Sequence, residues 1–512
     1  MNYKLIIPLS FLFISSAGKA NDVYKDRNGE YCNTQQLTQE KEVDKPFKEL
    51  CQIIDQYAES TLQKGHINSL AIAIYRNGEV YQQYYGELDK KSKQRPSDST
   101  LYEIASISKV FAGSLVAKAV LEQKITLNDD IRIYLKEDYP NLQFEGTPIT
   151  IQNLVTHTLG LQDKAPKELD KIYKKTREGY YENRPFSYTM SDLLEELKTV
   201  KLDKKPGTFY DYNSIGPELV TYILEQVYRK PYKELLQELL DELNLKQTFL
   251  NEYDRYKKQL AISYNENGEV APLLRNPLLG GSYGMISSLP DLTKFMKFQL
   301  ESNQPFIKEA SRLLFKEEED GDDKGYFWDV GYGLKEGAYY GKTGTSIGVQ
   351  SGILVCPDSR YGMIIMMNNT SDAAQDDWLE LYNKIETALI TYPKINLVSL
   401  LEKEFKNNFT VALEKYRTLE ADKEHYLSGS FYLNNLGYNF LNRKEIDKAI
   451  KVFELAIQYD TNNANLYDSL GEAYFLMKDY KKFLLSYQKS LDLDDTNDNA
   501  KNSIREIESL IK

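Results

Sequence analysis

Histidine and cysteine are scarce in this sequence, with 3 of each among 512 residues, and neither a CxxC nor an HExxH spacing occurs. A dedicated zinc or iron–sulfur site would have almost no ligands, so we expect no metal and no cofactor. Cations are also outnumbered, because 64 Lys and Arg face 76 Asp and Glu and leave a net charge of −12. Such a chain repels phosphate backbones and anionic lipids, which argues against a nucleic-acid partner. Any chemistry must come from serine, lysine, tyrosine or carboxylates.

The chain is long and apolar enough to form more than one folded unit. Hydrophobic residues make up 41% of it, aromatic residues 12% and charged residues 27%. This composition is typical of a globular protein and argues against general disorder. At roughly 100 to 200 residues per domain, the length predicts two or three units.

The first twenty residues have the three-part pattern of a secretory signal peptide. Lys4 precedes an apolar run over residues 5–14, and small residues follow as far as Ala20. The alternative is a membrane anchor, but the run is shorter than the roughly 20 residues that cross a bilayer. We therefore expect residues 1–20 to be removed and the mature protein to be secreted or periplasmic, without stable insertion in a membrane.

The three cysteines have different expected roles. In an oxidising compartment Cys32 and Cys51 could pair and close a short loop. Cys356 follows an apolar run and is expected to be a buried small hydrophobic residue.

Two distant segments of the chain predict β-hairpins. Residues 70–75 and 80–85 are strand-like and flank an Asn-Gly turn, and residues 352–356 and 362–367 flank a second turn. Helical patterns lie between them, over residues 110–123 and 190–200. We expect an α+β fold in which both ends of residues 21–392 form an antiparallel sheet, with a helical region inserted.

Beyond Pro393 the pattern is helical, with a linker over residues 393–427 and a repeat over 428–512. The repeat period is 34 residues, with a capping helix expected around Ile504. The aligned pairs are Leu436 with Leu470, Gly437 with Gly471, Phe440 with Tyr474, and Phe453 with Tyr487. This Leu-Gly-x-x-aromatic signature resembles the tetratricopeptide repeat, a helix pair that commonly binds a protein or peptide partner.

The most informative tetrapeptide runs from Ser106 to Lys109. A serine and a lysine spaced i, i+3 at a helix start share one face, so the lysine amine can reach the hydroxyl. Burial and the positive end of the helix dipole would lower the lysine pKa, so that a neutral amine could accept the serine proton. Alone, the motif is weak, because a serine at a helix start is often a cap.

Two further motifs follow in the chain. Tyr212-Asn213-Ser214 stands after a Pro-Gly pair, with Tyr210 as an alternative tyrosine, and residues 341–345 read Gly-Lys-Thr-Gly-Thr. In this order the three motifs resemble those of the penicillin-recognising serine hydrolases, which include class C β-lactamases, DD-peptidases and related esterases. The flanking segment 154–161, Leu-Val-Thr-His-Thr-Leu-Gly-Leu, is similar as well, and the resemblance covers roughly residues 55–369.

The resemblance implies a role for each motif residue. Ser106 would form an acyl-enzyme, and Lys109 would accept its proton or share that role with Tyr212. The backbone N–H groups of Ser106 and Thr345 would form the oxyanion hole. The residues expected to bind substrate are Lys342, Thr343, Gly344 and Ser214.

Ser214 departs from the family pattern, which has asparagine at this position. A hydroxyl cannot offer the separate carbonyl and NH2 groups of an amide, which weakens a β-lactamase interpretation more than a general hydrolase one. His157 is expected to form hydrogen bonds within the core and not to act as a base.

We therefore expect a serine hydrolase that cleaves an amide, peptide or ester through Ser106. The alternative is a catalytically degenerate binding protein that uses the hydrolase pocket and the repeats to recruit a partner. The sequence does not choose among D-Ala-D-Ala peptides, β-lactams, D-amino-acid peptides and esters, because loops set the substrate.

Overall fold

A computed structural model describes residues 45–511, apart from five gaps at 90–92, 178–187, 266, 274 and 318–320. The predicted signal peptide (residues 1–20) and Cys32 lie outside the described residues. Cleavage after Ala20 and pairing of Cys32 with Cys51 therefore stay predictions. Cys356 is fully buried, as expected.

The described residues form two compact units. One runs from residue 57 to 390, and the other combines residues 45–56 with residues 391–511. The predicted domain limits at residues 392 and 427 stay predictions. None of the helices in the described part of the chain has the length and apolar character needed to span a membrane.

A seven-stranded antiparallel sheet is the framework of the first unit, and it confirms the predicted α+β fold. Its order is β2-β1-β12-β11-β10-β9-β8, so strands from both ends of the unit lie side by side. The strands are β1 (Ser69–Arg76), β2 (Glu79–Gly86), β8 (Asp323–Lys324), β9 (Asp329–Gly333), β10 (Gly337–Thr345), β11 (Gln350–Cys356) and β12 (Tyr361–Met367).

The first hairpin forms for a local reason. Asn77 and Gly78 both have positive φ, 52° and 103°, which a tight hairpin turn requires and which these two residue types tolerate. β1 then pairs with β2 on one side and with β12 on the other. Its residues are buried up to Tyr75 because it lies inside the sheet.

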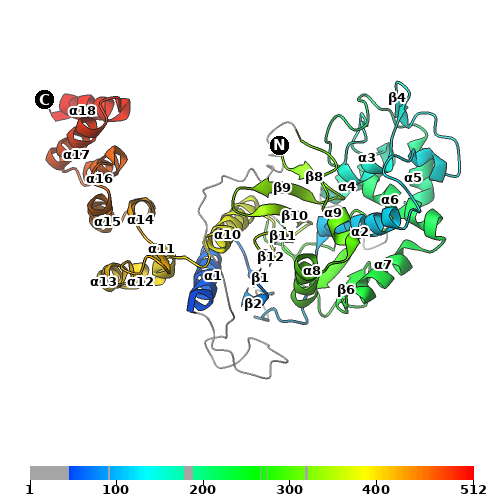
Figure 1. Cartoon of the computed structure of the whole chain (residues 1–512), viewed down its shortest axis with the longest axis horizontal. Coiled ribbons are helices and arrows are strands. Elements are labelled where there is room, and N and C mark those ends of the chain that lie inside the picture. Colours follow the sequence, from blue (N-terminus) through cyan, green and yellow to red (C-terminus); the bar gives the residue numbers. More distant parts are fainter. Residues whose placement is uncertain are drawn as a thin grey trace. The chain divides into compact units, whose positions relative to one another are not determined.

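Helices cover both faces of the sheet (Figure 1), which explains why β11 and β12 are buried at every residue. On one face α8 (Leu289–Glu301) packs against β1, β11 and β12. On the other face α10 (Asp372–Thr391) places Trp378 against Gly352 of β11.

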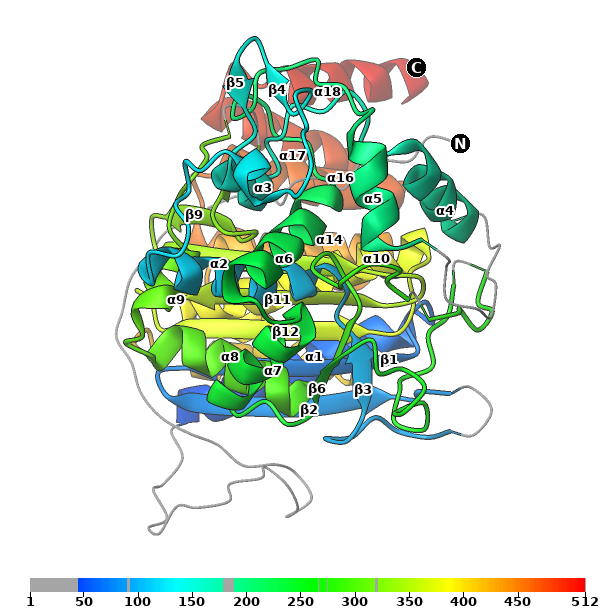
Figure 2. The same ribbon diagram turned by 90° about the vertical axis from the view of Figure 1, so that its right-hand side faces the viewer.

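The inserted helical region lies in front of the sheet in Figure 2. Its centre is α2 (Ser108–Leu121), which is almost entirely buried and contacts α6, α7 and α9. The other helices are α3 (Ile151–Thr156), α4 (Lys167–Arg177), α5 (Met190–Leu197), α6 (Ile215–Tyr228), α7 (Tyr232–Glu242) and α9 (Pro305–Ala310), with short helices η1 (Ala105–Ile107) and η2 (Ile131–Tyr134). Small sheets join β3 (Leu101–Glu103), β7 (Met285–Ser288) and β6 (Thr248–Leu250), and β4 (Gln143–Phe144) with β5 (Thr147–Pro148).

The second unit consists of helices and one short parallel strand pair, β13 (Ile395–Asn396) with β14 (Tyr426–Leu427). It includes the first part of α1 (Lys45–Gln63), where Gln56 donates a hydrogen bond to the Leu400 carbonyl. The remaining helices are α11 (Leu397–Leu400), α12 (Glu402–Asn407), α13 (Phe409–Leu419), α14 (Ser430–Asn442), α15 (Ile446–Tyr459), α16 (Ala464–Leu476), α17 (Tyr480–Leu493) and α18 (Asp498–Ile511).

Helices α14 to α17 form two similar pairs. A Cβ atom on Gly437 would lie 2.3 Å from the Phe453 ring, and one on Gly471 would lie 2.6 Å from the Tyr487 ring. The small residue in each first helix therefore lets the aromatic residue of the second helix approach closely. These are the positions that the 34-residue period aligned, and α18 follows where the capping helix was expected.

Candidate active site

Ser106 lies at the junction of β3 and α2, in the short helix η1. Its predecessor Ala105 has a φ of +45°, a left-handed conformation that costs a residue with a Cβ about 1 to 2 kcal/mol. Such strain is often found next to reactive groups. Lys109 follows in the first turn of α2, so the predicted i, i+3 arrangement is present, and Ser106 remains half-buried while Lys109 is buried.

Two side chains, those of Lys109 and Tyr212, contact the Ser106 hydroxyl group. Lys109 Nζ lies 3.2 Å from Ser106 Oγ, and the Tyr212 hydroxyl donates to the same oxygen at 2.7 Å. Lys109 also donates to the Ser282 carbonyl at 2.7 Å. Tyr212 is therefore the tyrosine that contacts the serine, whereas the Tyr210 ring lies against Lys324.

The surroundings lower the pKa of both partners of the serine. Burial holds the pKa of Lys109 below its usual value, and the charge of Lys342 lowers it further. Tyr212 and Glu218 raise this pKa but do not outweigh the lowering. Burial alone would raise the pKa of Tyr212, but the charges of Lys109 and Lys342 outweigh it and lower that pKa. Because the two groups interact, they titrate as a pair, and the pair loses a proton at lower pH than either isolated side chain would.

Strand β10 places Lys342 next to Tyr212, with its Nζ 5.4 Å from the ring centroid. The same ammonium group is paired with Asp329 of β9 at 3.1 Å, and Asp329 also pairs with Lys324 at 2.9 Å. Burial would lower the pKa of Lys342, yet Asp329 and Tyr212 raise it. Lys342 is therefore a charged lysine whose field acts on Tyr212, and a substrate carboxylate would compete with Asp329 for it.

The backbone of β10 runs close to the nucleophile. A Cβ atom on Gly344 would lie 2.4 Å from the Ile104 carbonyl oxygen and 3.0 Å from the Ser106 nitrogen, so only glycine fits here. Thr343 is half-buried, and Thr345 ends the strand with its hydroxyl bonded to Gln350 at 2.5 Å. The Ser106 nitrogen thus faces the strand that carries Thr345, although their assignment as an oxyanion hole stays a prediction.

Ser214 immediately precedes α6, and its hydroxyl group makes no capping hydrogen bond to that helix. The amide of Asn213, in contrast, is engaged in the loop, because it accepts from Gly216 N and donates to the Asp211 carbonyl. An asparagine is therefore present beside the expected position, but its side chain is committed to local structure. The role of Ser214 in substrate binding stays a prediction.

His157 is buried behind Tyr212, with ring centroids 4.6 Å apart. Its Nδ1 accepts from the Asn213 N–H at 3.4 Å. Burial, followed by the charges of Lys342, Lys109 and Lys324, holds its pKa well below the usual value. A neutral packed imidazole agrees with the expected core role.

The sequence did not single out two carboxylates and one carbonyl of this site. Asp329 neutralises Lys342, and Glu218 accepts both polar hydrogens of Ser282, the residue whose carbonyl contacts Lys109. Isolated carboxylates have no diagnostic spacing. The sequence signals for them were the acidic residue Glu218 near the start of the apolar helix α6 and the Gly-Gly-Ser segment that ends at Ser282.

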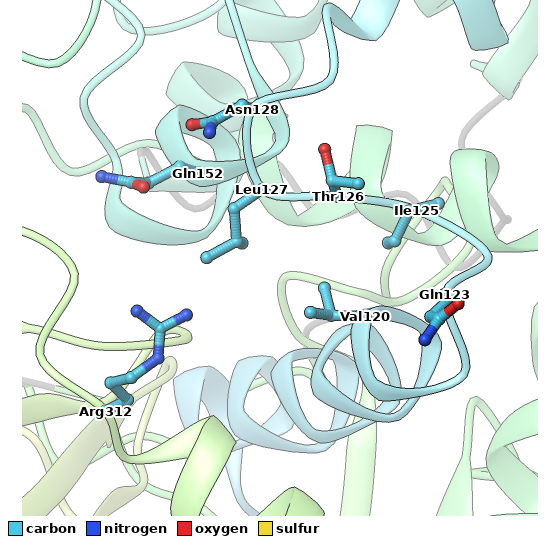
Figure 3. A pocket seen from close by; sticks show the side chains of 8 residues that line it. All are labelled: Val120, Gln123, Ile125, Thr126, Leu127, Asn128, Gln152 and Arg312. Atoms are coloured by element: carbon cyan, nitrogen blue, oxygen red, sulfur yellow. The ribbon is translucent and has the colours of Figure 1, made fainter.

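The first unit contains one cavity that predicted site residues line and a larger one that they do not. One of about 20 Å³ is lined by Lys342 and Thr343, together with Asp322 and Asp329. Another of about 370 Å³ lies between the end of α2, the segment after it, Gln152 and Arg312 (Figure 3), and none of the predicted site residues lines it. Arg312 is paired with Glu309, so this larger cavity offers no uncompensated cation. Across the described residues, no group of three or more His, Cys, Asp or Glu could hold a metal ion.

Comparisons with known proteins are consistent with this geometry. Protein flp of Staphylococcus aureus (strain N315) is 26% identical over 381 residues, which cover 72% of each chain. A β-lactamase of Providencia stuartii is 23% identical over 352 residues, covering 62% of this chain and 86% of that one.

Solved structures share the fold. A β-lactamase/D-alanine carboxypeptidase from Pseudomonas syringae superimposes with a TM-score of 0.56 at 22% identity, over 66% of this chain and 98% of that one. A penicillin-binding protein homologue from Pyrococcus abyssi, described as octameric, gives 0.55 at 21% identity, over 64% of this chain and 75% of that one.

Family matches cover both units. Residues 432–463 and 464–497 each match the tetratricopeptide repeat, which confirms the predicted repeats. Residues 54–383 match the Beta-lactamase family. The chain therefore belongs to the β-lactamase family, as its three ordered motifs predicted, and it also carries two C-terminal tetratricopeptide repeats.

Proposed function

We propose that this protein is a serine hydrolase that cleaves an amide, peptide or ester through an acyl-enzyme on Ser106. The observation that carries the proposal is the pair of contacts at Ser106 Oγ, 3.2 Å from Lys109 Nζ and 2.7 Å from the Tyr212 hydroxyl. A serine hydroxyl is a weak nucleophile unless an adjacent base accepts its proton. Here the candidate base is a buried lysine coupled to a tyrosine.

In acylation, Ser106 Oγ attacks the substrate carbonyl carbon while its proton passes to neutral Lys109 or to the Tyr212 phenolate. The N–H groups of Ser106 and Thr345 would stabilise the oxyanion, a contribution of about 2.7 to 4 kcal/mol per donor in comparable sites. Tyr212 or Lys109 then returns the proton to the leaving group, and the bond from carbon to that group breaks. In deacylation a water molecule attacks the ester carbon, loses a proton to the same pair, and frees Ser106.

The location and the partner are part of the same proposal. The pattern of residues 1–20 supports secretion or transfer to a periplasm, where an extracellular substrate would be available. The repeat unit supports binding of a protein or peptide, the usual role of such helix pairs.

A fluorophosphonate probe tests the nucleophile directly. We expect one adduct, mapped to the peptide that contains Ser106, and its loss in Ser106→Ala. Ser108→Ala is the matched control, because Ser108 lies two residues away and its hydroxyl accepts from the Met285 N–H rather than contacting Ser106, Lys109 or Tyr212. An adduct that persists in Ser106→Ala would exclude this mechanism, and an unlabelled wild-type protein would favour the catalytically degenerate binding protein.

A further inference from the structure

The carboxylate of Glu218 has no exposed surface and accepts five hydrogen bonds from one loop. The donors to Oε2 are the N–H groups of Leu279 at 3.0 Å and Gly280 at 3.1 Å. Those to Oε1 are the Ser282 N–H at 2.9 Å, the Ser282 hydroxyl at 2.5 Å and the Asn276 amide at 2.9 Å. Within the described residues no lysine, arginine or histidine lies within ion-pair distance of this carboxylate, so the five hydrogen bonds from the loop are its direct partners.

The same loop carries the carbonyl that holds Lys109. Ser282 O accepts from Lys109 Nζ at 2.7 Å, a shorter contact than the 3.2 Å between Lys109 and Ser106 Oγ. Ser282 therefore links the two groups, because its N–H and hydroxyl bind Glu218 while its carbonyl binds the lysine. A shift of the loop would move the amine away from the nucleophile.

Glu218 also acts on Lys109 through its charge. Burial lowers the pKa of Lys109, and the negative charge of Glu218 is among the influences that oppose this. The titratable groups that interact with Lys109 are Tyr212, Lys342, His157 and Glu218. Those that interact with Glu218, besides Lys109, are Tyr173, Tyr232 and Tyr283.

We propose that Glu218 is a positioning residue, which holds the loop over residues 276–282 so that the Ser282 carbonyl keeps the Lys109 amine on Ser106. The role rests on the proposed function, because it matters only if Lys109 serves the nucleophile. Glu218 does not touch the reacting atoms and acts through Ser282. No spacing in the sequence marks it, and its contacts come from a segment about sixty residues away.

The sharpest variant is Glu218→Gln, which keeps the shape and removes the charge. Both carboxylate oxygens face donors, so the amide NH2 group must face another donor in either orientation. We expect the plateau rate of Ser106 labelling to fall about tenfold or more, because general-base contributions of this kind typically span 10² to 10⁴. The acid limb of the pH profile should move to lower pH, since loss of the charge and loss of the carbonyl contact both lower the Lys109 pKa.

Two further variants separate charge from geometry. Glu218→Asp keeps the charge but shortens the side chain, so the rate should fall while the acid limb stays closer to the wild-type position. Ser282→Ala removes one of the five hydrogen bonds to Glu218 and a 3.3 Å hydrogen bond from Asn276, but it keeps the carbonyl, so it should fold and show a smaller loss of rate. It therefore keeps the proposal testable if the Glu218 variants do not fold.

Asp291→Asn is the control for loss of a buried carboxylate, because Asp291 is also fully buried and accepts from Gln247 N and from Thr248 Oγ1 of β6, although it pairs with Lys294 as well. It should lower the melting temperature without moving the acid limb. Unchanged rate and acid limb in folded Glu218→Gln, or in Ser282→Ala if the former does not fold, would overturn the positioning role alone. A wild-type protein that is never labelled at Ser106 would overturn the proposed function and the positioning role together.

Discussion

Lys109 is buried and shares its site with a second lysine, so its ammonium form is disfavoured and its pKa is lowered. At low pH the amine is protonated and cannot accept the proton of Ser106. As the pH rises through the lowered pKa of the pair formed by Lys109 and Tyr212, the acceptor becomes available. Acylation should therefore increase with pH and reach a plateau below the pH at which an ordinary lysine would titrate.

Lys109→Arg tests this base. A guanidinium group stays protonated, so we expect the rate of acylation to fall about 100-fold or more and its rise with pH to disappear. The measurement is the rate of labelling of Ser106 across the pH range. Lys118→Arg is the control, since Lys118 lies on the same helix but pairs with Glu242. Near-normal acylation by Lys109→Arg would exclude Lys109 as the acceptor.

Asp329 limits what Lys342 can bind. Its carboxylate bridges Lys342 and Lys324, so an incoming substrate carboxylate must compete with an internal one. In Asp329→Asn the competitor is gone and two buried ammonium groups are left without their shared counter-ion. Removing one partner of a buried ion pair commonly costs about 3 to 5 kcal/mol of stability.

We therefore expect Asp329→Asn to be less stable but to prefer carboxylate-bearing substrates more strongly. The measurement is the ratio of kcat/KM for an ester that carries a free carboxylate to kcat/KM for its neutral methyl ester. This ratio should rise about tenfold or more, since one charge-assisted hydrogen bond contributes about 1.5 to 3 kcal/mol. An unchanged ratio would mean that Lys342 does not contact a substrate carboxylate.

Motif residues were predictable from the sequence because each belongs to a short pattern. Ser106, Lys109, Tyr212 and Lys342 came from three such patterns, and the structure brings all four together. Glu218 could not be predicted, because its importance depends on a loop that is distant in sequence. The same holds for Asp329 and Ser282, whose contacts arise from pairing between strands and from loop packing.

At the scale of elements, the hairpins were predictable and the sheet edge was not. The β1–β2 and β11–β12 hairpins have turn signals between segments with strand-like patterns. β8 has two residues, and β9 reads Asp-Val-Gly-Tyr-Gly without an alternating pattern. Such short, glycine-containing strands form because β10 provides a partner for β9, which is a tertiary effect that local propensity does not encode.

Helix α10, on the face of the sheet opposite α8, carries a carboxyl group with a raised pKa, that of Glu386. Burial raises the pKa of Glu386 to about 8, with help from the negative charges of Glu336 and Asp322. In the unfolded chain this group titrates near 4.5. The folded state therefore binds the proton more tightly, and the contribution of Glu386 to stability decreases as the pH rises from about 4.5 to about 8.

Glu386→Gln should abolish that loss. We expect the variant to exceed the wild type in free energy of unfolding at pH 8 by up to a few kcal/mol, and to differ little at pH 4.5. Denaturant titration at several pH values measures this. Glu380→Gln on the same helix is the control, because lysine contacts outweigh burial and lower the Glu380 pKa to about 2, outside this window. A difference in stability between Glu386→Gln and the wild type that does not change from pH 4.5 to 8 would contradict this account of Glu386.

At the scale of the whole molecule, every group proposed for the chemistry comes from the first unit, residues 57–390. The repeats contribute packing residues such as Gly437 and Phe453. Their period was legible because tight helix contacts demand a small residue at a fixed position. The inclusion of residues 45–56 in the second unit was not predictable, since it depends on contacts such as that of Tyr426 with Glu49.

Gly437→Ala tests whether chemistry and repeats are separable in the full-length chain. The added methyl group would lie 2.3 Å from the Phe453 ring, and such overpacking typically costs about 1 to 3 kcal/mol. We expect the repeat unit to unfold at lower temperature while Ser106 labelling stays within about twofold of wild type. Asn435→Ala, an exposed position on the same helix, should change neither. A selective loss of labelling with the first unit still folded would mean that the repeats complete or gate the site.

The central claim is that substrate carbon becomes covalently bound to Ser106. Intact-mass spectrometry of acid-quenched reactions with a panel of activated esters and β-lactams measures this most directly. For at least one compound, we predict a mass gain equal to a single acyl group, located on the Ser106 peptide and absent in Ser106→Ala. Hydrolysis that continues at the wild-type rate in Ser106→Ala, or an acyl group attached to another residue, would contradict the account.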